Sequence, residues 1–436
     1  MPLFAGESRP PARHTRSLAL CAFLCLVGPA RAGDPVAEFK RAWAAAGADP
    51  VAQAEAVTAL ARGGTLPCAR LLARLALRQD IAASVREAAE RSLFVLPSPE
   101  VDVWAGDGVS GGEKDPSLRV LLCRLLAFRS ARDPRVGLLL IPALEDRQER
   151  VRVAAVEGLS TVRDKDVIAA LVRCLTKARG RLRADAHRAL RRLTGVEIAS
   201  PDDWGPWWEA QREVFRFRSV GEDDGAEEDE GPARTVTRLE PPGRSGRTIF
   251  GGVASERVVF VVDVSGSMET RCQDSEGGSR SRLDYVRAEL DAVLDGLDEA
   301  TRFDLVAFST QVRAWRGKLV RASAANKRKA RGWLRRALRP DGETNIYGAL
   351  EAAFRHRDAD TIYFLSDGTP TAGEVTVGEE ILARVRQWNS GRGVRVHTIG
   401  FLAGAPGPLV LEDKGMSKRF LAALAKATGG TFRAYE

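Results

Sequence analysis

The chain has 436 residues, of which 44% are hydrophobic and 28% charged, and this is the composition of an ordinary globular protein. A chain of this length is expected to form two or three domains. The formal net charge of +8 is modest for the size, so charge alone gives no argument for a nucleic-acid partner.

Residues 1–32 have the features of an export signal. Arginines precede the apolar stretch SLALCAFLCLVGPA, and small residues at 30–32 provide a cleavage site after Ala32. The stretch is shorter than the ~20 residues that a membrane-spanning helix needs, with an uncleaved anchor as the alternative. No later segment is apolar enough to span a membrane. We therefore expect a soluble exported protein, in the periplasm, at the cell surface or in the medium.

Residues 33–215 carry a repeated helical pattern. Stretches that end on leucine recur at intervals of 33, 33, 33 and 31 residues, starting at Ala52, Val85, Leu118, Val151 and Leu182. Such a period predicts stacked helical hairpins, each of which buries its apolar face against its neighbours. An arginine recurs at the second position of the last four stretches, at 86, 119, 152 and 183. The Val-Arg-x-x-Ala-x-x-x-Leu helix resembles short HEAT-type repeats over about residues 36–195, with an irregular bundle as the alternative.

Three further features belong to this region. Asp80, Asp115 and Asp146 lie shortly before repeat helices, where N-cap residues belong. Residues 97–117 contain prolines and a glycine-rich segment, which indicates a surface insertion. The three tryptophans of the segment 202–210 are expected to cap the end of the stack rather than to form a binding platform.

Residues 216–250 are expected to be a linker. The segment 222–230 carries seven acidic side chains in nine residues, which repel one another and cannot fold alone. Calcium binding there is less favoured, because the acids lack the regular alternation of a calcium-binding loop.

Residues 251–436 alternate apolar strands with amphipathic helices. Strands are predicted at 257–264, 301–309, 360–368, 394–401 and 431–435. Continuous apolar strands separated by helices are typical of a doubly wound α/β fold, whose mostly parallel sheet is covered on both faces. The chain is thus predicted to join an all-α repeat region to an α/β domain.

Oxygen-bearing side chains are predicted to gather at one end of this sheet. Asp263, Ser265 and Ser267 follow the first strand in an Asp-x-Ser-x-Ser motif. Thr344 precedes a helix, and Asp367 ends another buried strand. Because such sheets bind ligands at the carboxyl ends of their strands, we expect the five side chains to converge. A turn and a helix cap would explain them one by one, but not as a group.

In motif, order and strand pattern, residues 250–436 resemble a von Willebrand factor type A domain with its metal-ion-dependent adhesion site. The resemblance implies that Ser265 and Ser267 bind Mg²⁺ directly and that Thr344 binds it directly or through water. Asp263 and Asp367 would act mainly through water, and Mn²⁺ or Ca²⁺ are further candidate ions. Neutral hydroxyl ligands leave the ion electrophilic, which implies a protein partner that supplies an aspartate or glutamate.

The segment 269–281 is longer than in many members of that family. Glu269, Asp274 and Glu276 are expected to reach the ion or to influence the choice of partner, with a mobile polar loop as the alternative. Cys272 is a candidate for pairing with another chain. The four cysteines of the mature chain form no CxxC pair, so neither a zinc site nor a redox motif is indicated.

The sequence offers no argument for catalysis. It contains no HExxH, GKS or GKT motif, and no histidine lies near the serines along the chain. The basic helix predicted at 326–336 is expected to be a solvated surface rather than a nucleic-acid site. We therefore expect a non-enzymatic exported binding protein whose repeats form a second interaction surface. The alternatives are an accessory subunit of an AAA+ or chelatase-like complex, a metal-dependent hydrolase, and a structural protein without a working metal site.

Overall fold

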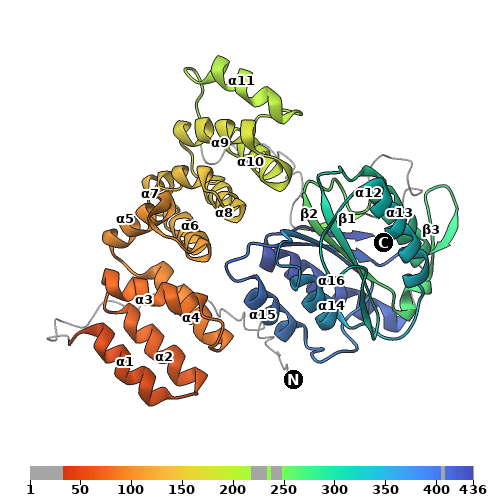
Figure 1. The fold of residues 1–436 in the computed structure, drawn as a ribbon, viewed down its shortest axis with the longest axis horizontal. Coiled ribbons are helices and arrows are strands. Elements are labelled where there is room, and N and C mark those ends of the chain that lie inside the picture. The colour runs from red at the N-terminus through yellow and green to blue at the C-terminus, as the bar shows by residue number, and fades with distance from the viewer. Residues whose placement is uncertain (1–32, 218–232, 237–247, 404–407, 436) are drawn as a thin grey trace, which may run out of the picture.

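The structure is a computed structural model that describes residues 33–217, 233–236, 248–403 and 408–435. The predicted export signal at 1–32 and the acidic segment 222–230 lie outside these residues. An all-helical repeat region is followed by an α/β domain with a mostly parallel sheet (Figure 1), which confirms the predicted fold class. None of the described helices is both long and apolar enough to cross a membrane.

The repeat helices stack along a curved arm (Figure 1). They are α1 (Pro35–Ala46), α2 (Pro50–Ala61), α3 (Leu66–Leu77), α4 (Ala83–Val95), α5 (Pro99–Asp107), α6 (Pro116–Ser130), α7 (Pro134–Leu138), α8 (Glu149–Leu159), α9 (Lys165–Lys177), α10 (Gly180–Thr194) and α11 (Trp204–Gln211). One continuous cluster of buried leucine, valine and alanine side chains runs through them. Each repeat therefore buries its apolar face against its neighbours, as the sequence period requires.

The arginine that recurs in the repeats stabilises the turn that precedes its own helix. The arginines at 86, 119 and 152 each donate from Nη1 to two backbone carbonyls of the preceding turn, and Arg183 donates to the carbonyl of Leu175. These bonds span 2.6–3.4 Å. Carbonyls at helix ends and turns need partners from outside the helix, and the repeated arginine supplies them.

Arg119 also joins two neighbouring repeats. Its Nε and Nη2 donate to Asp146 Oδ2 and Oδ1 over 2.6 and 2.9 Å. The prediction that Asp146 caps a helix is therefore wrong, and Gln148 occupies the N-cap position of α8. The carboxylate still accepts from the N–H of Gln148 over 2.7 Å, so it stabilises the turn before α8 while it pairs with the buried guanidinium of the adjacent repeat.

Two other predictions for the repeats are wrong and two are confirmed. Asp80 pairs with Arg78 instead of capping α4, whereas Asp115 caps α6 as predicted. The segment 97–117 is no surface insertion, because α5 and the turn after it bury apolar side chains against the repeat core. Trp204 and Trp208 are buried against the last repeat, which confirms that the tryptophans cap the stack.

The α/β domain is built around one sheet. Its strands are β1 (Ala233–Val236), β2 (Arg257–Asp263), β5 (Arg302–Phe308), β6 (Val312–Ala314), β7 (Val320–Arg321), β8 (Thr361–Ser366), β9 (Arg395–Phe401) and β10 (Phe432–Tyr435). They lie in the order β1-β10-β9-β8-β2-β5-β6, with β7 also paired to β5. All pairs are parallel except those that β6 and β7 make with β5.

Helices cover both faces of the sheet. They are α12 (Arg282–Gly296) and α13 (Ala324–Ala337) on one face, and α14 (Ile346–Phe354), α15 (Gly378–Asn389) and α16 (Pro408–Thr428) on the other. Along β2, Val258, Phe260 and Val262 belong to the first core, and Val259 and Val261 to the second. Burial on both faces explains why this strand is apolar at every position from Val258 to Val262.

The end of the predicted linker belongs to the α/β domain. β1 lies within the stretch 216–250 and forms the edge of the sheet, in parallel with β10. Ile249 and Phe250 are buried in the core near Phe260. The linker prediction is therefore wrong for this part, because a four-residue edge strand has no apolar run that a pattern search could find.

The repeats dock on the amino ends of the strands. Arg181 of α10 donates from Nη1 to the carbonyls of Asp360 and Gly393 over 2.7 and 2.8 Å. Arg395, the first residue of β9, forms an ion pair with Asp185 of the same helix. The inner side of the arm therefore faces the α/β domain, while β3 (Arg271–Gln273), which follows the carboxyl end of β2, lies on the far side (Figure 1).

The contact between Arg119 and Asp146 predicts a large effect on stability. Arg119→Met keeps the length of the side chain but leaves a buried carboxylate without its counter-charge and two carbonyls without a donor. We expect the free energy of unfolding to fall by about 2 kcal/mol, measured by urea unfolding. Arg135→Met is the control, because the Arg135 side chain is 87% exposed and pairs only at the surface. Equal shifts in the two variants would contradict the structural role of Arg119.

A buried charge pair supports β5 in the centre of the α/β domain. His356 Nε2 lies 2.8 Å from Asp304 Oδ2, and His356 Nδ1 lies 3.1 and 3.2 Å from the carbonyls of Ala352 and Ala353. Both ring nitrogens face acceptors, so both carry protons. Burial by itself lowers the pKa of His356, but Asp304 and the two carbonyls together raise that pKa above its ordinary value.

This raised pKa predicts that stability falls at alkaline pH. The unfolded pKa of histidine is about 6.5, so the contribution of His356 is complete below about pH 6.5 and is lost as the pH rises through the folded pKa. Urea unfolding between about pH 6 and 9 should show the advantage of the wild type over His356→Gln shrinking with pH. An advantage that is the same at every pH would contradict a charged pair.

Candidate metal centre

Asp263 and Asp367 lie at the carboxyl ends of two neighbouring parallel strands. Asp263 is the last residue of β2, and Asp367 directly follows β8. From β2 the chain continues to β5 on one side and later returns to β8 on the other, so these ends form the crevice in which doubly wound sheets bind ligands. Asp263 is 0% exposed and Asp367 is 7% exposed.

A tight turn after β2 places two serine hydroxyls beside these carboxylates. The Ser265 N–H donates to Asp263 Oδ1 over 2.8 Å, which reverses the chain directly after the strand. Ser265 Oγ and Ser267 Oγ lie 3.1 Å apart, and Ser267 Oγ donates to Asp367 Oδ1 over 2.8 Å. Four of the five predicted residues are thus linked by direct contacts.

Thr344 reaches the same edge through the loop before α14. The Gly266 N–H donates to the Gly342 carbonyl over 3.1 Å, which ties this loop to the serine turn. Thr344 is buried, and a Cβ atom on Gly368 would lie 3.7 Å from its Oγ1, so the hydroxyl lies close to the residue after Asp367. All five predicted residues therefore lie at one edge of the sheet.

Two buried side chains that the sequence analysis missed hold the carboxylates in place. Ser366, the last residue of β8, donates from Oγ to Asp263 Oδ2 over 2.6 Å. Arg282, the first residue of α12, donates from Nη1 to Asp367 Oδ2 over 2.5 Å and from Nε to the Ala403 carbonyl over 2.7 Å. A serine beside an aspartate and an arginine at a helix start were visible in the sequence, but neither signal is specific.

The two carboxylates are unfavourable neighbours without a cation. Burial, and after it the charge of Asp367, raise the pKa of Asp263 to about 7, although Ser265 and Ser366 donate hydrogen bonds to it. Burial also raises the pKa of Asp367, against the effect of Arg282. Arg282 provides one positive charge for two acids, so a divalent cation would supply the charge that is missing.

The oxygen set fits Mg²⁺. This ion prefers oxygen ligands at about 2.1 Å in an octahedron, in which neighbouring ligands lie about 3 Å apart. The separation of 3.1 Å between Ser265 Oγ and Ser267 Oγ agrees with that spacing. Among the described residues no three His, Cys, Asp or Glu side chains gather into another candidate metal site. The two serines and Thr344 would hold the ion, with the two aspartates around them.

The segment 269–281 forms a hairpin rather than an irregular loop. β3 (Arg271–Gln273) pairs antiparallel with β4 (Ser279–Ser281). Asp274 Oδ1 accepts from the N–H groups of Glu276 and Gly278 over 3.0 and 2.8 Å, so this carboxylate shapes the turn. Cys272 is buried, which argues against its pairing with another chain.

The family comparisons agree with both halves of the fold. Residues 256–434 match the family model of the von Willebrand factor type A domain, and all five candidate ligands lie within this span. This part of the chain is a von Willebrand factor type A domain. Residues 112–191 match the family model of HEAT repeats, so both resemblances seen in the sequence are confirmed. Von Willebrand factor type A (VWA) domains are protein-interaction modules.

Curated relatives match over a part of their length. Human von Willebrand factor A domain-containing protein 3B is 26% identical over 204 residues, which are 47% of this chain and 14% of that protein. Human inter-alpha-trypsin inhibitor heavy chain H4 is 36% identical over 149 residues, which are 31% of this chain and 15% of that protein. The chain thus spans about one seventh of the length of these relatives.

The solved structures that match parts of the chain include the von Willebrand factor type A protein from Catenulispora acidiphila. It is 23% identical, with a TM-score of 0.33, and the match covers 42% of this chain and 39% of that chain. The RO (RSR) protein of Deinococcus radiodurans is 13% identical, with a TM-score of 0.25, and the match covers 88% of this chain and 89% of that chain.

A variant of Ser366 tests whether the hydrogen bond to Asp263 contributes to metal binding. Ser366→Ala removes the hydrogen bond to Asp263 but leaves all five candidate ligands in place. Because such bonds orient metal-binding side chains, we expect the affinity for Mg²⁺ to fall about 10-fold, measured by isothermal titration calorimetry. Ser323→Ala is the control, since Ser323 caps α13 beside the amino end of β5. An unchanged affinity in Ser366→Ala would contradict the supporting role.

Proposed function

We propose that the VWA domain holds Mg²⁺ and captures an aspartate or glutamate side chain of a protein partner outside the cytoplasm. The observation that carries this proposal is the convergence of three hydroxyl groups and two buried carboxylates at the carboxyl ends of β2 and β8. Mn²⁺ or Ca²⁺ would use the same ligands. Export rests on the signal-like segment 1–32.

The exposure of the candidate ligands leaves room for a partner. Asp263, Ser265, Thr344 and Asp367 are buried, whereas Ser267 is exposed. An ion held here would be covered by the sheet on one side and accessible from the side of Ser267. Since neutral hydroxyls provide most of the direct contacts, the ion keeps its preference for a further anionic ligand, which a carboxylate of the partner supplies.

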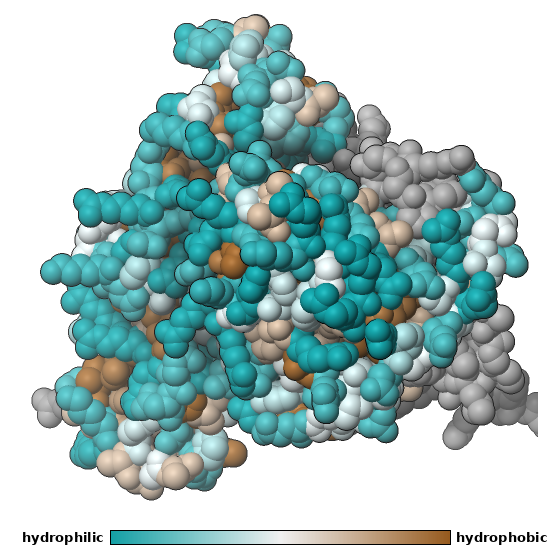
Figure 2. Space-filling model, turned by 45° about the vertical axis from the view of Figure 1, so that its right-hand side comes forward, coloured by the Kyte–Doolittle hydropathy of each residue, from teal (hydrophilic) through white to brown (hydrophobic). Residues whose placement is uncertain are grey.

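The surface of the protein favours binding of a partner through polar contacts. The face drawn in Figure 2 is largely hydrophilic, and the hydrophobic side chains of the described residues on it form small separate areas. A partner that binds through a metal–carboxylate contact needs no large apolar patch.

The repeats are proposed as a second interaction surface. A groove of about 550 Å³ remains between α4, α6 and α8 of the arm and α15 of the VWA domain. Its basic side chains, which include Arg91, Arg124 and Arg386, outnumber the acidic ones. This surface therefore suits an acidic segment of a partner.

The same domain is proposed to bind rather than to catalyse. The described histidines lie elsewhere, since His356 contacts Asp304, His187 accepts from Trp204, and His397 lies near the amino end of β9. A Gly-x-Ser-x-Gly sequence at 108–112 follows a helix instead of a strand, and the hydroxyl of Ser110 donates to the Gly106 carbonyl over 2.7 Å. Among the described residues no histidine accompanies the serines of the metal centre as a general base.

Metal binding and capture can be tested with one pair of variants. We expect the wild-type chain to bind one Mg²⁺ or Mn²⁺ in calorimetry and Asp263→Ala to bind none, because the carboxylate beneath the serine turn is gone. Glu299→Ala is the matched control, since Glu299 is exposed near the amino end of β5. Circular dichroism should show that both variants fold.

The same proteins, immobilised, should retain exported proteins in Mg²⁺ and release them in EDTA. The Asp263→Ala variant should retain none of the proteins that EDTA releases from the wild type, and the Glu299→Ala variant should retain all of them. Capture that survives both EDTA and Asp263→Ala would refute metal-mediated binding.

A further inference from the structure

A strongly basic surface lies on the side of the VWA domain that is away from the arm, where Figure 1 shows α13. It is formed by the segment 313–339, which contains eleven arginine and lysine residues and no aspartate or glutamate. The segment includes the edge strand β6, the short strand β7 and the helix α13, which pack against β5 and α12. We call it the basic surface, and neither the metal centre nor the repeats use it.

Two of the eleven cations connect α13 to α12. Arg331 pairs with Asp291 and Asp295, and Lys327 donates from Nζ to the carbonyls of Asp295 and Leu297 over 3.0 and 2.6 Å. The other nine are exposed, and they are Arg313, Arg316, Lys318, Arg321, Arg328, Lys329, Arg335, Arg336 and Arg339.

The nine exposed cations lack acidic partners. Within the part of the chain that the structure describes, none of them forms an ion pair with a carboxylate. Arg313 donates from Nη2 to the Ala337 carbonyl over 3.3 Å, which connects β6 to the end of α13. These charges are therefore free to meet an anionic partner.

The acidic side chains around the basic surface do not balance it. Those of β5 and α12 already have basic partners, in the pairs Asp304–His356, Asp284–Arg287, Asp291–Arg331 and Asp295–Arg331. Arg335 also lies close to Asp291. Four exposed acids remain beside the segment in the chain, and they are Asp298, Glu299, Asp341 and Glu343. Nine exposed cations against these four acids leave an excess of five positive charges.

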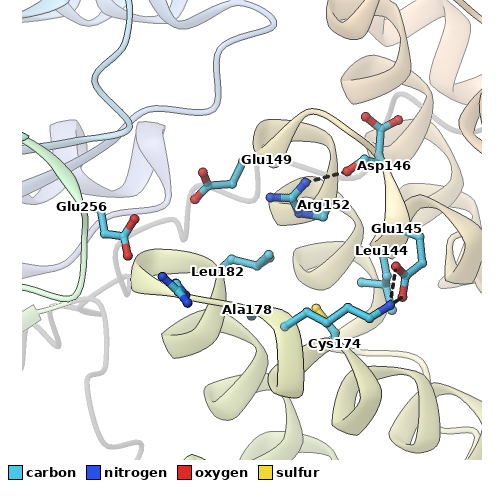
Figure 3. A pocket seen from close by; sticks show the side chains of 11 residues that line it. Leu144, Glu145, Asp146, Glu149, Arg152, Cys174, Ala178, Leu182 and Glu256 are labelled. Carbon is cyan, nitrogen blue, oxygen red and sulfur yellow. Dashed lines mark hydrogen bonds and ion pairs between the residues drawn. The ribbon is translucent and has the colours of Figure 1, made fainter. Parts of the chain in front are cut away.

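The charged pocket between the arm and the VWA domain is different. Figure 3 shows this pocket of about 340 Å³, in which Lys177 pairs with Glu145 and Arg152 donates to the carbonyl of Asp146. Its charged side chains are the acids Glu145, Asp146, Glu149 and Glu256 and the cations Arg152, Lys177 and Arg179. Opposite charges are nearly equal in number there, so the pocket offers no comparable surplus to an anion.

The cations of the basic surface are spread over an area. On α13, Arg328 and Arg336 are eight residues apart and so lie on one face of the helix, separated by about 12 Å along its axis. A second row follows β5, where Arg313 lies opposite Ala307 and Arg321 lies opposite Arg302, over about 17 Å. Two rows on neighbouring elements suit a planar array of anions better than one extended strand of them.

Two tryptophans lie among these cations. Trp315 and Trp333 are partly buried against the core, and the Arg316 guanidinium lies over the Trp315 ring at 4.7 Å from its centroid. Tryptophan rings of this kind are frequent at the boundary between membrane and water. The large hydrophobic side chains that are exposed among the described residues all lie outside 313–339. A membrane contact here would therefore be electrostatic, without an inserted apolar segment.

We propose that the basic surface binds the anionic phospholipid headgroups of a membrane. Its guanidinium and ammonium groups donate to the phosphate oxygens of the lipids, and clusters of cations are attracted by the negative potential of an anionic leaflet. The proposal goes beyond the proposed function and does not require the metal ion. Binding in this orientation holds the chain at the membrane with the arm on the other side of the VWA domain, free for a protein partner.

Flotation of the chain from Gly33 onward with lipid vesicles tests this surface. This form contains every described element and lacks the apolar segment 1–32, and EDTA in the buffer excludes bridging by divalent cations. We expect binding to vesicles of equal parts phosphatidylglycerol and phosphatidylcholine, and none to vesicles of phosphatidylcholine alone. Arg328→Gln combined with Lys329→Gln should weaken binding about 20-fold, since each cation near an anionic leaflet contributes about fivefold.

The matched control is Lys40→Gln combined with Arg41→Gln. It removes the same charge from two adjacent exposed residues of α1, and it should bind like the wild type. The Asp263→Ala variant should also bind normally, which separates this outcome from that of the metal centre. Equal binding to neutral vesicles, or equal losses in the two double variants, would overturn the proposal.

Two further measurements test the nature of the contact. Raising the salt concentration from about 0.1 M to about 0.5 M should release the chain from the vesicles, and binding that persists would overturn an electrostatic contact. Dextran sulfate and duplex DNA present soluble polyanions. Tighter binding to either of them than to the vesicles, at the same concentration of anionic groups, would overturn the membrane as the partner.

Discussion

The burial of two carboxylates side by side, at the carboxyl ends of β2 and β8, constrains the whole candidate metal centre. Both strands are covered by helices on both faces, so water cannot solvate these charges from the core side. Hydrogen bonds from Ser366 and the serine turn, together with the charge of Arg282, offset the unfavourable burial in part. The remaining deficit of positive charge is what makes this edge of the sheet suited to a divalent cation.

The parallel sheet gives the two ends of the VWA domain different roles. Parallel strands place all their carboxyl ends at one edge, where the candidate ligands lie, and all their amino ends at the other. Arginines gather at the amino ends, where Arg181 and Arg395 connect the last repeat to the sheet. The HEAT repeats are therefore held in place without covering the candidate metal centre, and the inner side of the arm is turned towards the VWA domain.

The repeat region shows which features local sequence patterns can predict and which they cannot. The interval of the repeats, the tryptophans that cap the stack and the cap at Asp115 follow from helix periodicity and local hydrogen bonds, and the structure confirms them. Asp80 and Asp146 have the same local signature as Asp115, but neither is an N-cap residue and both pair with arginines. For Asp146 the competing partner comes from the neighbouring repeat, which a local pattern cannot indicate.

The sequence by itself determined the helical repeats, the α/β domain and the set of five oxygen-bearing residues, because these depend on periodicity and on a short motif with fixed order. Only the tertiary structure decided which side chains support that set, where β1 joins the sheet and how the two regions dock. Arg282 and Asp367 are 85 positions apart, and Asp185 and Arg395 are 210 apart. Contacts over such separations depend on how the elements pack in space, and no local pattern of residues records that packing.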